Sequence, residues 1–283
     1  MPAMLINGQP SQQIPADDRG FQYGDGLFET ALVVNGQVRF LEDHCQRLFT
    51  GCARLGITPP DEATLRREIA QVAVQTDRPQ ADPVQTGRVG VQNRGVLKII
   101  VTRGAGGRGY RPTAGMPSNR VVALHPFNPV PQGALRLRWC DIRLGRNARL
   151  AGIKHLNRLE QVLAQSEWRE GDADEGLMLD TEGEVVCATS ANVFAVRDNT
   201  LLTPDLRFCG VQGVMRAQVI KTAAKLKLAV SEEPLWPHDL ETASEVFITN
   251  AVRGIRSVAS LDSLQWSETG VATRLSSALS LSN

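Results

Sequence analysis

The sequence predicts an α+β protein with two lobes. Short alternating apolar runs, which are typical of strands, mix along the chain with longer segments of helical periodicity. With 283 residues the chain is long enough for two modest domains with separate cores. The best candidate linker is 127–133, because it contains Pro129 and Pro131. We therefore expect an N-terminal α/β lobe over 1–126 and a C-terminal lobe over 134–283.

The expected N-terminal lobe alternates strands with helices. Asn35-Gly36 is a strong hairpin turn, because tight hairpins need residues that tolerate positive φ. Helical periodicity covers Glu42–Leu55 and Asp61–Val74. Thr76–Gly95 has no period and several Pro and Gly residues, so a loop is expected there. The strands expected in this lobe are Met4–Asn7, Glu29–Val34, Val38–Leu41, Leu97–Thr102 and Val121–His125.

The expected C-terminal lobe has the same mixture of elements. A helix is predicted over Leu156–Glu170, where apolar residues recur on one side, and another over Val214–Leu228. The strand Glu245–Thr249 is expected to close the core pattern. The other expected strands are Leu135–Cys140, Gly176–Asp180, Glu184–Cys187 and Asn192–Val196.

Bulk properties exclude several function classes. The chain has 31 Lys and Arg against 30 Asp and Glu, so no global basic field points to nucleic acid or to an anionic membrane. Met1–Gln13 lacks the basic and apolar regions of a secretory signal, and no apolar run approaches the roughly 18 residues of a membrane span. The five cysteines are odd in number and have no C-x-x-C spacing. We therefore expect a cytoplasmic protein with reduced thiols and no metal site.

Two glycine-rich segments are candidates for a site. Arg19–Thr30 taken alone indicates a turn that leads into a strand, with no chemical mechanism of its own. Val101–Arg111 places Arg103, Arg108 and Arg111 among four glycines, without the Gly-Lys-Ser/Thr of a nucleotide loop. Because guanidinium groups bind carboxylates with two hydrogen bonds, the segment could clamp an anionic substrate. A solvated basic turn is the equally open alternative.

Two further segments suggest a cofactor. Lys154 follows Ile153 directly before an expected helix, and a lysine in an apolar setting can form imines. A plain surface lysine is the alternative. Gly210–Arg216 leads into a helix whose N-terminal amides could bind phosphate, and Thr249-Asn250-Ala251 could supply further amides.

Six motifs then occur in a characteristic order: Asp18-Arg19-Gly20, Tyr23-Gly24-Asp25-Gly26-Leu27-Phe28-Glu29-Thr30, His44-x-x-Arg47-Leu48, Lys154-His155-Leu156-Asn157, Asn192-Val193-Phe194 and Gly213-Val214-Met215-Arg216. In this order they resemble the fold-type IV pyridoxal-phosphate enzymes, which are D-amino-acid aminotransferase-like and two-lobed. That family includes branched-chain aminotransferases, D-amino-acid aminotransferases and 4-amino-4-deoxychorismate lyases. The resemblance covers nearly the whole chain apart from Thr76–Gly95 and the C-terminal end.

Two long segments of unusual composition are similar to the lyase branch in particular. They are Arg103–Tyr110 and 144–163. This resemblance implies conversion of 4-amino-4-deoxychorismate to 4-aminobenzoate and pyruvate, a step towards folate. It also implies pyridoxal 5'-phosphate, bound to Lys154 as a Schiff base in the cleft between the lobes, and a homodimer.

The resemblance also implies roles for single residues. Lys154 matches the catalytic lysine that binds the cofactor and moves the proton. The other cofactor-binding positions are Arg47 for the phosphate, and Cys187, Val214, Met215, Asn250 and Ala251. The substrate-binding positions are Phe28, Thr30 and Arg108.

Cys187 departs from the family pattern. The family places a glutamate beside the pyridine nitrogen, five residues before the Asn-hydrophobic-Phe motif, and here that position is Cys187. Glu182 and Glu184 are near in sequence but out of register. Two alternatives therefore stay open beside the lyase: an aminotransferase for D- or branched-chain amino acids, and a non-catalytic relative that binds the cofactor or a partner.

Overall fold

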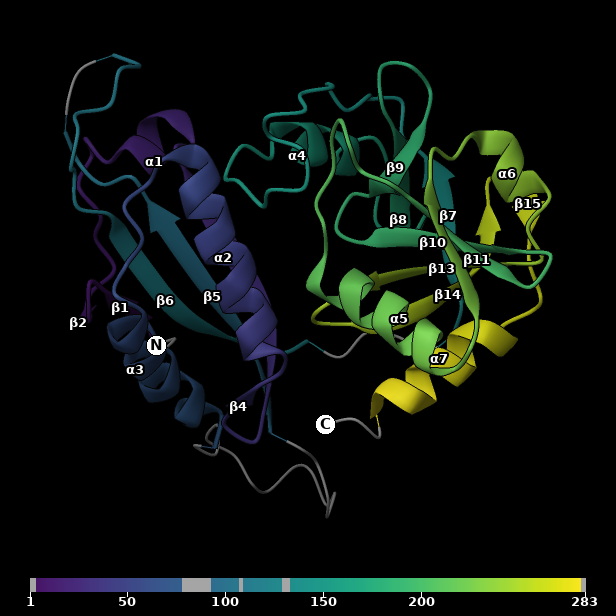
Figure 1. Cartoon of the computed structure of the whole chain (residues 1–283), viewed down its shortest axis with the longest axis horizontal. Coiled ribbons are helices and arrows are strands. Elements are labelled where there is room, and N and C mark those ends of the chain that lie inside the picture. Colours follow the sequence, from purple (N-terminus) through teal and green to yellow (C-terminus); the bar gives the residue numbers. More distant parts are fainter. Residues whose placement is uncertain (1–3, 78–92, 107–108, 129–132, 281–283) are drawn as a thin grey trace. The chain divides into compact units, whose positions relative to one another are not determined.

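The computed structural model describes residues 4–77, 93–106, 109–128 and 133–280 of the chain. They form two compact units, each with its own sheet (Figure 1). The first unit comprises Met1–Pro129 and Lys154–Asn157, and the second comprises Val130–Ile153 and Arg158–Asn283. Most of the predicted linker, 127–133, and most of the predicted loop Thr76–Gly95 lie outside the described residues. The segment with Lys154 groups with the first unit, although in sequence it falls within the predicted C-terminal lobe.

The described strands of the first unit form an antiparallel sheet of six strands in the order β2-β1-β6-β5-β3-β4. The predicted hairpin turn is present between β3 and β4, with Asn35 at φ 48° and Gly36 at φ 74°. The strands are β1 (Met4–Ile6), β2 (Gln9–Pro10), β3 (Gly26–Val34), β4 (Gln37–Val38), β5 (Arg94–Thr102) and β6 (Asn119–Pro126).

Two helices, α2 (Leu41–Leu55) and α3 (Glu62–Ala73), pack on one face of this sheet. β3 alternates between the two faces, as a strand must. Leu27, Glu29 and Ala31 point towards α2 and are buried. On the opposite face Phe28 and Thr30 are only half-buried. One face of the sheet is therefore a core, and the other is partly open.

The second unit is built on a sheet of nine described strands in the order β12-β11-β10-β13-β14-β7-β8-β9, with β15 paired to β14. Its core includes a stacked pair, Phe194 and Phe247, with ring centroids 5.1 Å apart. The strands are β7 (Leu135–Trp139), β8 (Glu175–Leu179), β9 (Val185–Ala188), β10 (Asn192–Arg197), β11 (Thr200–Pro204), β12 (Ala229–Glu233), β13 (Glu245–Asn250), β14 (Gly254–Leu261) and β15 (Leu264–Gln265). The helices are α4 (Leu159–Gln165), α5 (Val214–Lys225), α6 (Pro237–Glu241) and α7 (Gly270–Ser280).

Four sequence-based expectations differ from the structure. The strand expected over Val38–Leu41 is confined to β4, because α2 begins at Leu41. The helix predicted over Leu156–Glu170 shrinks to α4, because residues 154–156 pair with β3 instead. The strand Glu245–Thr249 does not close the pattern, since β14 returns beside β13 and α7 follows it. The turn expected near Arg19 is a short helix, α1 (Arg19–Tyr23), because the Asp18 side chain caps its first amides.

Two global features complete the fold. Within the described ranges, none of the helices is long and apolar enough to cross a bilayer. All five cysteines are free thiols, and Cys209 alone among them is more than slightly exposed.

Candidate active site

The segment that carries Lys154 pairs with the edge of β3. The amide of Phe28 donates to the carbonyl oxygen of Lys154 at 3.0 Å. The amide of Leu156 donates to the carbonyl oxygen of Gly26, also at 3.0 Å, and an antiparallel bridge lies between these two hydrogen bonds. Because β5 occupies the other edge of β3, residues 154–156 act as a short additional strand. This backbone pairing fixes the main chain of Lys154.

The two glycines of the Tyr-Gly-Asp-Gly motif make this approach possible. A β-carbon on Gly24 would lie 2.5 Å from Oδ1 of Asn157, and one on Gly26 would lie 2.7 Å from Cδ1 of Leu156. The side-chain amide of Asn157 also donates to the carbonyl oxygen of Gly24 at 3.1 Å. The motif therefore has a structural mechanism that its sequence alone does not reveal: it leaves room for the lysine segment.

Lys154 lies against an aromatic ring. Its Nζ is 4.3 Å from the centroid of the Phe28 ring. The register explains the contact, because Phe28 and Lys154 face each other across the strand pair and so share one face. Thr30 lies on the same face, two residues further along β3. The structure thus places Lys154, the predicted cofactor lysine, on the same face as Phe28 and Thr30, the predicted substrate contacts.

Glu29 points to the α2 side of β3 and is 1% exposed. Its carboxylate accepts hydrogen bonds from Nε of Arg47 at 2.7 Å and from Nη2 of the same guanidinium. Nδ1 of His44 lies 2.7 Å from the carboxylate. Burial acts to raise the pKa of Glu29, but Arg47 and His44 outweigh it, and the net pKa is lowered. A buried carboxylate therefore fixes the orientation of the Arg47 side chain.

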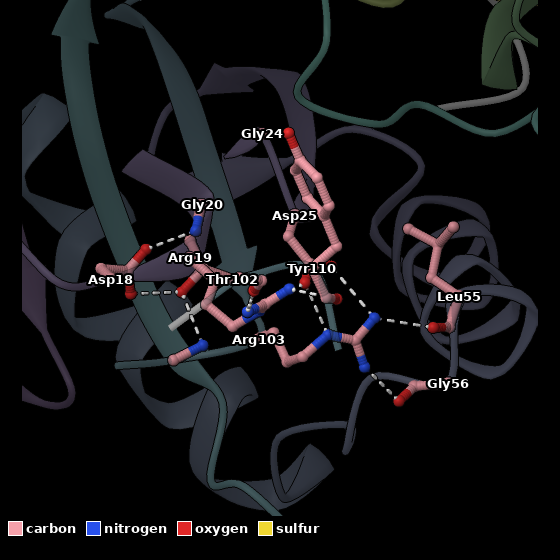
Figure 2. A network of polar contacts seen from close by, with 12 residues as sticks. Asp18, Arg19, Gly20, Gly24, Asp25, Leu55, Gly56, Thr102, Arg103 and Tyr110 are labelled. Atoms are coloured by element: carbon pink, nitrogen blue, oxygen red, sulfur yellow. Dashed lines mark hydrogen bonds and ion pairs between the residues drawn. The ribbon is translucent and has the colours of Figure 1, made fainter. Parts of the chain in front are cut away.

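Asp25 joins two arginines in the same unit (Figure 2). It accepts hydrogen bonds from Nε of Arg19 at 2.9 Å and from Nε of Arg103 at 2.7 Å. Burial acts to raise the pKa of Asp25, but the hydrogen bonds from Arg103 and Arg19 lower it overall. Arg103 also donates to the carbonyl oxygens of Leu55 and Gly56 at the end of α2. Arg103 thus joins Asp25 to the end of α2, and the prediction that it clamps an anionic substrate does not hold.

Arg19 anchors the glycine-rich segment that follows β5. Its two terminal nitrogens donate to the carbonyl oxygens of Gly109 and Tyr110 at 2.8 and 2.9 Å. Arg108, the predicted substrate contact in this segment, lies outside the described residues, so its role stays a prediction.

In the second unit, a loop over 208–213 leads into α5. The amide of Gly152 donates to the carbonyl oxygen of Gly210 at 3.0 Å. The side-chain amide of Asn192, the first residue of β10, donates to the carbonyl oxygen of Val211 at 2.8 Å. The Asn-hydrophobic-Phe motif therefore holds the loop from which α5 starts.

The N-terminus of α5 has the properties of an anion site. Its N-cap, Gly213, supplies no side-chain hydrogen bond to the first turn. The first amides of a helix have no acceptor within the helix, so those of Val214 and Met215 can serve a ligand. The helix dipole favours a negative charge at the same place.

Asn250 and Ala251 lie in the turn between β13 and β14. The side-chain oxygen of Asn250 accepts from the amides two and three residues further on, at 3.1 and 2.8 Å. Asn192 pairs with Thr249 in the register of the sheet. The turn therefore lies at the same end of the sheet as the loop that Asn192 holds, so the predicted phosphate residues of this unit gather there.

Replacing Gly213 by alanine is expected to disturb this site. The new β-carbon would lie 2.1 Å from Oδ1 of Asn192, so the loop before α5 has to shift. Affinity for pyridoxal phosphate should fall roughly tenfold, as measured by absorbance titration of the apoprotein. Gly270→Ala is the matched control, because nothing lies within 4 Å of a β-carbon at Gly270. If the two variants bind pyridoxal phosphate with equal affinity, the N-terminus of α5 does not bind the cofactor.

Cys187 lies on β9, opposite Met178, and is 8% exposed. It belongs to an apolar cluster that includes Cys140 and Leu144. Burial, and then the neighbouring Cys209, raises the pKa of the Cys187 thiol to about 12. The thiol is therefore neutral throughout the physiological range and cannot replace a carboxylate as an anionic partner.

Sequence reasoning missed two residues of the first unit: Glu29, which binds Arg47, and His44, which contacts the same carboxylate. A signal for both was present. His44 and Arg47 are three residues apart, so they share one face of a helix. Glu29 falls on the buried phase of an alternating strand, where a carboxylate needs partners.

Comparisons with known proteins bear on the whole chain. The family model Amino-transferase class IV matches residues 26–261. An aminodeoxychorismate lyase from Vibrio harveyi is 32% identical over 90% of this chain and 90% of its own length. A putative branched-chain-amino-acid aminotransferase from Methanocaldococcus jannaschii is 33% identical over 92% of this chain and 88% of its own.

A solved structure agrees with these relatives. The 4-amino-4-deoxychorismate lyase from Pseudomonas aeruginosa superposes with a TM-score of 0.89 at 40% identity, over 98% of this chain and 97% of that one. The predicted fold class, α+β of fold-type IV, is confirmed. The chain is a member of the class IV aminotransferase family of enzymes.

Proposed function

We propose that the protein is an aminodeoxychorismate lyase that depends on pyridoxal 5'-phosphate and forms 4-aminobenzoate and pyruvate. The observation that supports this best is the placement of Lys154. A primary amine is held by backbone pairing against the ring of Phe28, in a chain similar to lyases over nearly its full length. The finer assignment to the lyase rests on that similarity and on the segments Arg103–Tyr110 and 144–163.

Considered by their chemistry alone, the proposed residues suit the cofactor at two of its three ends. Lys154 offers the primary amine that can bond to an aldehyde. In the first unit Arg47 offers a guanidinium, which suits a phosphate dianion. In the second unit Val214, Met215, Asn250 and Ala251 offer backbone amides, which suit the same group. The start of α5 needs a glycine at position 213, because a β-carbon there would collide with the side chain of Asn192. At the third end, Cys187 offers a neutral thiol where a ring nitrogen prefers an anion.

Each residue of the proposed site has a separate role in the reaction. When bound, pyridoxal phosphate supplies an electron-withdrawing ring that makes the carbon bearing the substrate's amine acidic. The Lys154 amine would remove the proton from that carbon, and enolpyruvate would depart with the electrons of its C–O bond and take up a proton to become pyruvate. The Phe28 ring packs beside Lys154 and would limit the access of water to the amine from that side. Glu29 keeps Arg47 oriented for the phosphate.

An aminotransferase for D- or branched-chain amino acids is the second candidate. It is favoured by relatives such as the D-alanine aminotransferase of Bacillus licheniformis, 26% identical over 92% of this chain. Cys187 speaks against it, because transamination relies on a protonated ring nitrogen, and a neutral thiol does not stabilise that charge.

The test is a coupled assay for pyruvate with aminodeoxychorismate, run beside a panel of D- and L-amino acids with a 2-oxo acid acceptor. We expect pyruvate release from aminodeoxychorismate to exceed amino transfer from every donor. Faster turnover of an amino donor would overturn the lyase assignment in favour of the second candidate.

Replacing Cys187 by glutamate should raise side transamination more than lyase turnover. An added carboxylate favours the protonated ring, and amino transfer needs that electron sink. The lyase reaction needs it less, because the product ring becomes aromatic. Half-reactions with D- and L-alanine, followed by the cofactor spectrum, measure the effect, and Cys187→Gln controls for size. A rise of lyase turnover by orders of magnitude would contradict this account.

We also propose a cytoplasmic homodimer. The five free thiols suit a reducing compartment. On α4, Leu159, Val162 and Leu163 are 69%, 57% and 48% exposed, and such apolar side chains are typical of subunit contacts. Light scattering on the purified protein measures the mass directly.

A further inference from the structure

Glu175 is a buried carboxylate of the second unit. It is the first residue of β8 and is 5% exposed. Its hydrogen-bond donors in the described part of the chain are all neutral groups: two hydroxyls, the side-chain amide of Gln165 and the backbone amide of Gly176. Burying a charge costs free energy even where hydrogen bonds offset part of the cost, so a carboxylate at this position points to a specific task.

The carboxylate of Glu175 holds the turn between β9 and β10. Its Oε2 accepts a hydrogen bond from the hydroxyl of Ser190 at 2.6 Å, and its Oε1 accepts one from the hydroxyl of Thr189. The backbone amide of Thr189 also donates to the carbonyl oxygen of Gly176 at 3.0 Å. The turn is therefore fastened to the start of β8 through two side chains and one backbone hydrogen bond.

This turn also contacts both segments of the second unit that are predicted to bind phosphate. The carbonyl oxygen of Ser190 accepts a hydrogen bond from the side-chain amide of Asn250 at 3.3 Å. Asn192, two residues after Ser190, donates to the carbonyl oxygen of Val211 in the loop before α5. Ser190 is exposed, whereas Glu175 behind it is buried. One buried carboxylate therefore supports the turn to which both phosphate segments are attached.

A carboxylate suits this turn better than an amide of the same shape. Both oxygens of Glu175 accept hydrogen bonds, so the two hydroxyl groups can donate at the same time. With glutamine, one arm is an NH2 group that only donates, and the hydroxyl that faces it loses its acceptor. The turn would then be held on one side alone, and the Ser190 carbonyl group that binds Asn250 would lose its fixed position.

We propose that Glu175 is a positioning residue for the cofactor phosphate. It holds the β9–β10 turn so that the Asn250 turn and the loop before α5 present their backbone amides to one anion. The inference rests on the proposed function for the identity of the cofactor. Glu175 acts through Thr189 and Ser190, so its loss should weaken binding of the phosphate group and leave the aldehyde chemistry at Lys154 unchanged.

The experiment compares Glu175→Gln with Glu245→Gln, which also removes one buried charge from the same sheet. Glu245 is 1% exposed, lies at the opposite end of β13 from Asn250, and accepts hydrogen bonds from the amides of Val271 and Ala272 in α7. Absorbance titration of each apoprotein measures its affinity for pyridoxal phosphate and for pyridoxal, which has the same aldehyde and no phosphate. Urea unfolding measures the stability of each protein.

We expect Glu175→Gln to bind pyridoxal phosphate roughly tenfold more weakly than the wild type, with its affinity for pyridoxal unchanged. Glu245→Gln should match the wild type for both ligands, whatever stability it loses. Ser190→Ala, which removes one hydroxyl and keeps the carbonyl that Asn250 binds, should show a smaller loss in the same direction, and it carries the comparison if Glu175→Gln does not fold. The proposal is wrong if the two ligands lose affinity equally, if the two glutamine variants behave alike, or if no affinity is lost.

Failure of the proposed function gives a different result. A wild type that binds pyridoxal phosphate but releases no pyruvate from aminodeoxychorismate contradicts the lyase assignment alone, and the comparison of Glu175→Gln with Glu245→Gln still decides the role of Glu175. A wild type that binds pyridoxal phosphate no more tightly than pyridoxal has no phosphate site, and this result overturns the positioning role as well.

Discussion

Lys154→Ala is expected to abolish pyruvate formation and covalent retention of the cofactor. A methyl group cannot form an imine or move a proton, so turnover should fall by roughly 10³-fold or more. The fold should survive, because an alanine keeps the backbone hydrogen bond from Phe28 to this residue and the one from Leu156 to Gly26. Loss of activity is then a loss of chemistry, and unfolding curves check this.

Borohydride reduction followed by mass spectrometry measures the covalent link. In the wild type the peptide with Lys154 should carry the added cofactor mass, and in Lys154→Ala no peptide should. Lys154→Arg is the matched control, since it keeps the positive charge beside Phe28 without an amine that forms imines. Near-native turnover in the alanine variant would show that the central assignment is wrong.

Glu29→Ala should produce the largest loss of stability. The substitution leaves Arg47 and His44 facing a buried site without the carboxylate, and breaking a buried pair in this way costs about 3–5 kcal/mol. Affinity for pyridoxal phosphate should fall as well, because Arg47 loses its orientation. Urea unfolding and cofactor titration measure the two effects. Glu42→Ala is the control, since Glu42 forms an exposed pair with Arg66, and little change is expected there.

The same carboxylate predicts an acid limit to stability. The pKa of Glu29 is lower in the folded protein than in the unfolded chain. Its contribution is therefore complete above the unfolded pKa of about 4.3 and is lost as the pH falls through the folded pKa. Glu29→Gln should be less stable than the wild type at neutral pH and should lose less stability on acidification. If the free energy of unfolding falls equally in the wild type and in Glu29→Gln between pH 6 and pH 3, Glu29 does not set the acid limit.

Local patterns predicted much of the architecture. Alternation located β3 and β5, helical periodicity located α2, α3 and α5, and Asn35-Gly36 located the hairpin between β3 and β4. The failures arose where distant segments meet. Helical periodicity after Leu156 was outweighed by backbone pairing with Gly26, and one sequence carries no local signal for such a partner.

The candidate site also has a part that the sequence predicted and a part that it did not. Motif order pointed to Lys154 and Phe28, which the structure places in contact. The partners of charged groups were not predictable, because they depend on which faces meet: Arg103 bonds to Asp25 across the first unit, and Arg47 bonds to Glu29.

The pairing of residues 154–156 with β3 has a consequence for how the chain folds. The contact joins parts of the sequence that are far apart, so its loop-closure cost is high and we expect it to form late in folding. Until then the start of β3 is an open strand edge, available to other chains. We therefore expect the first unit to be most prone to aggregation before this pairing forms, and the pairing that protects the strand edge is the one that brings Lys154 into place.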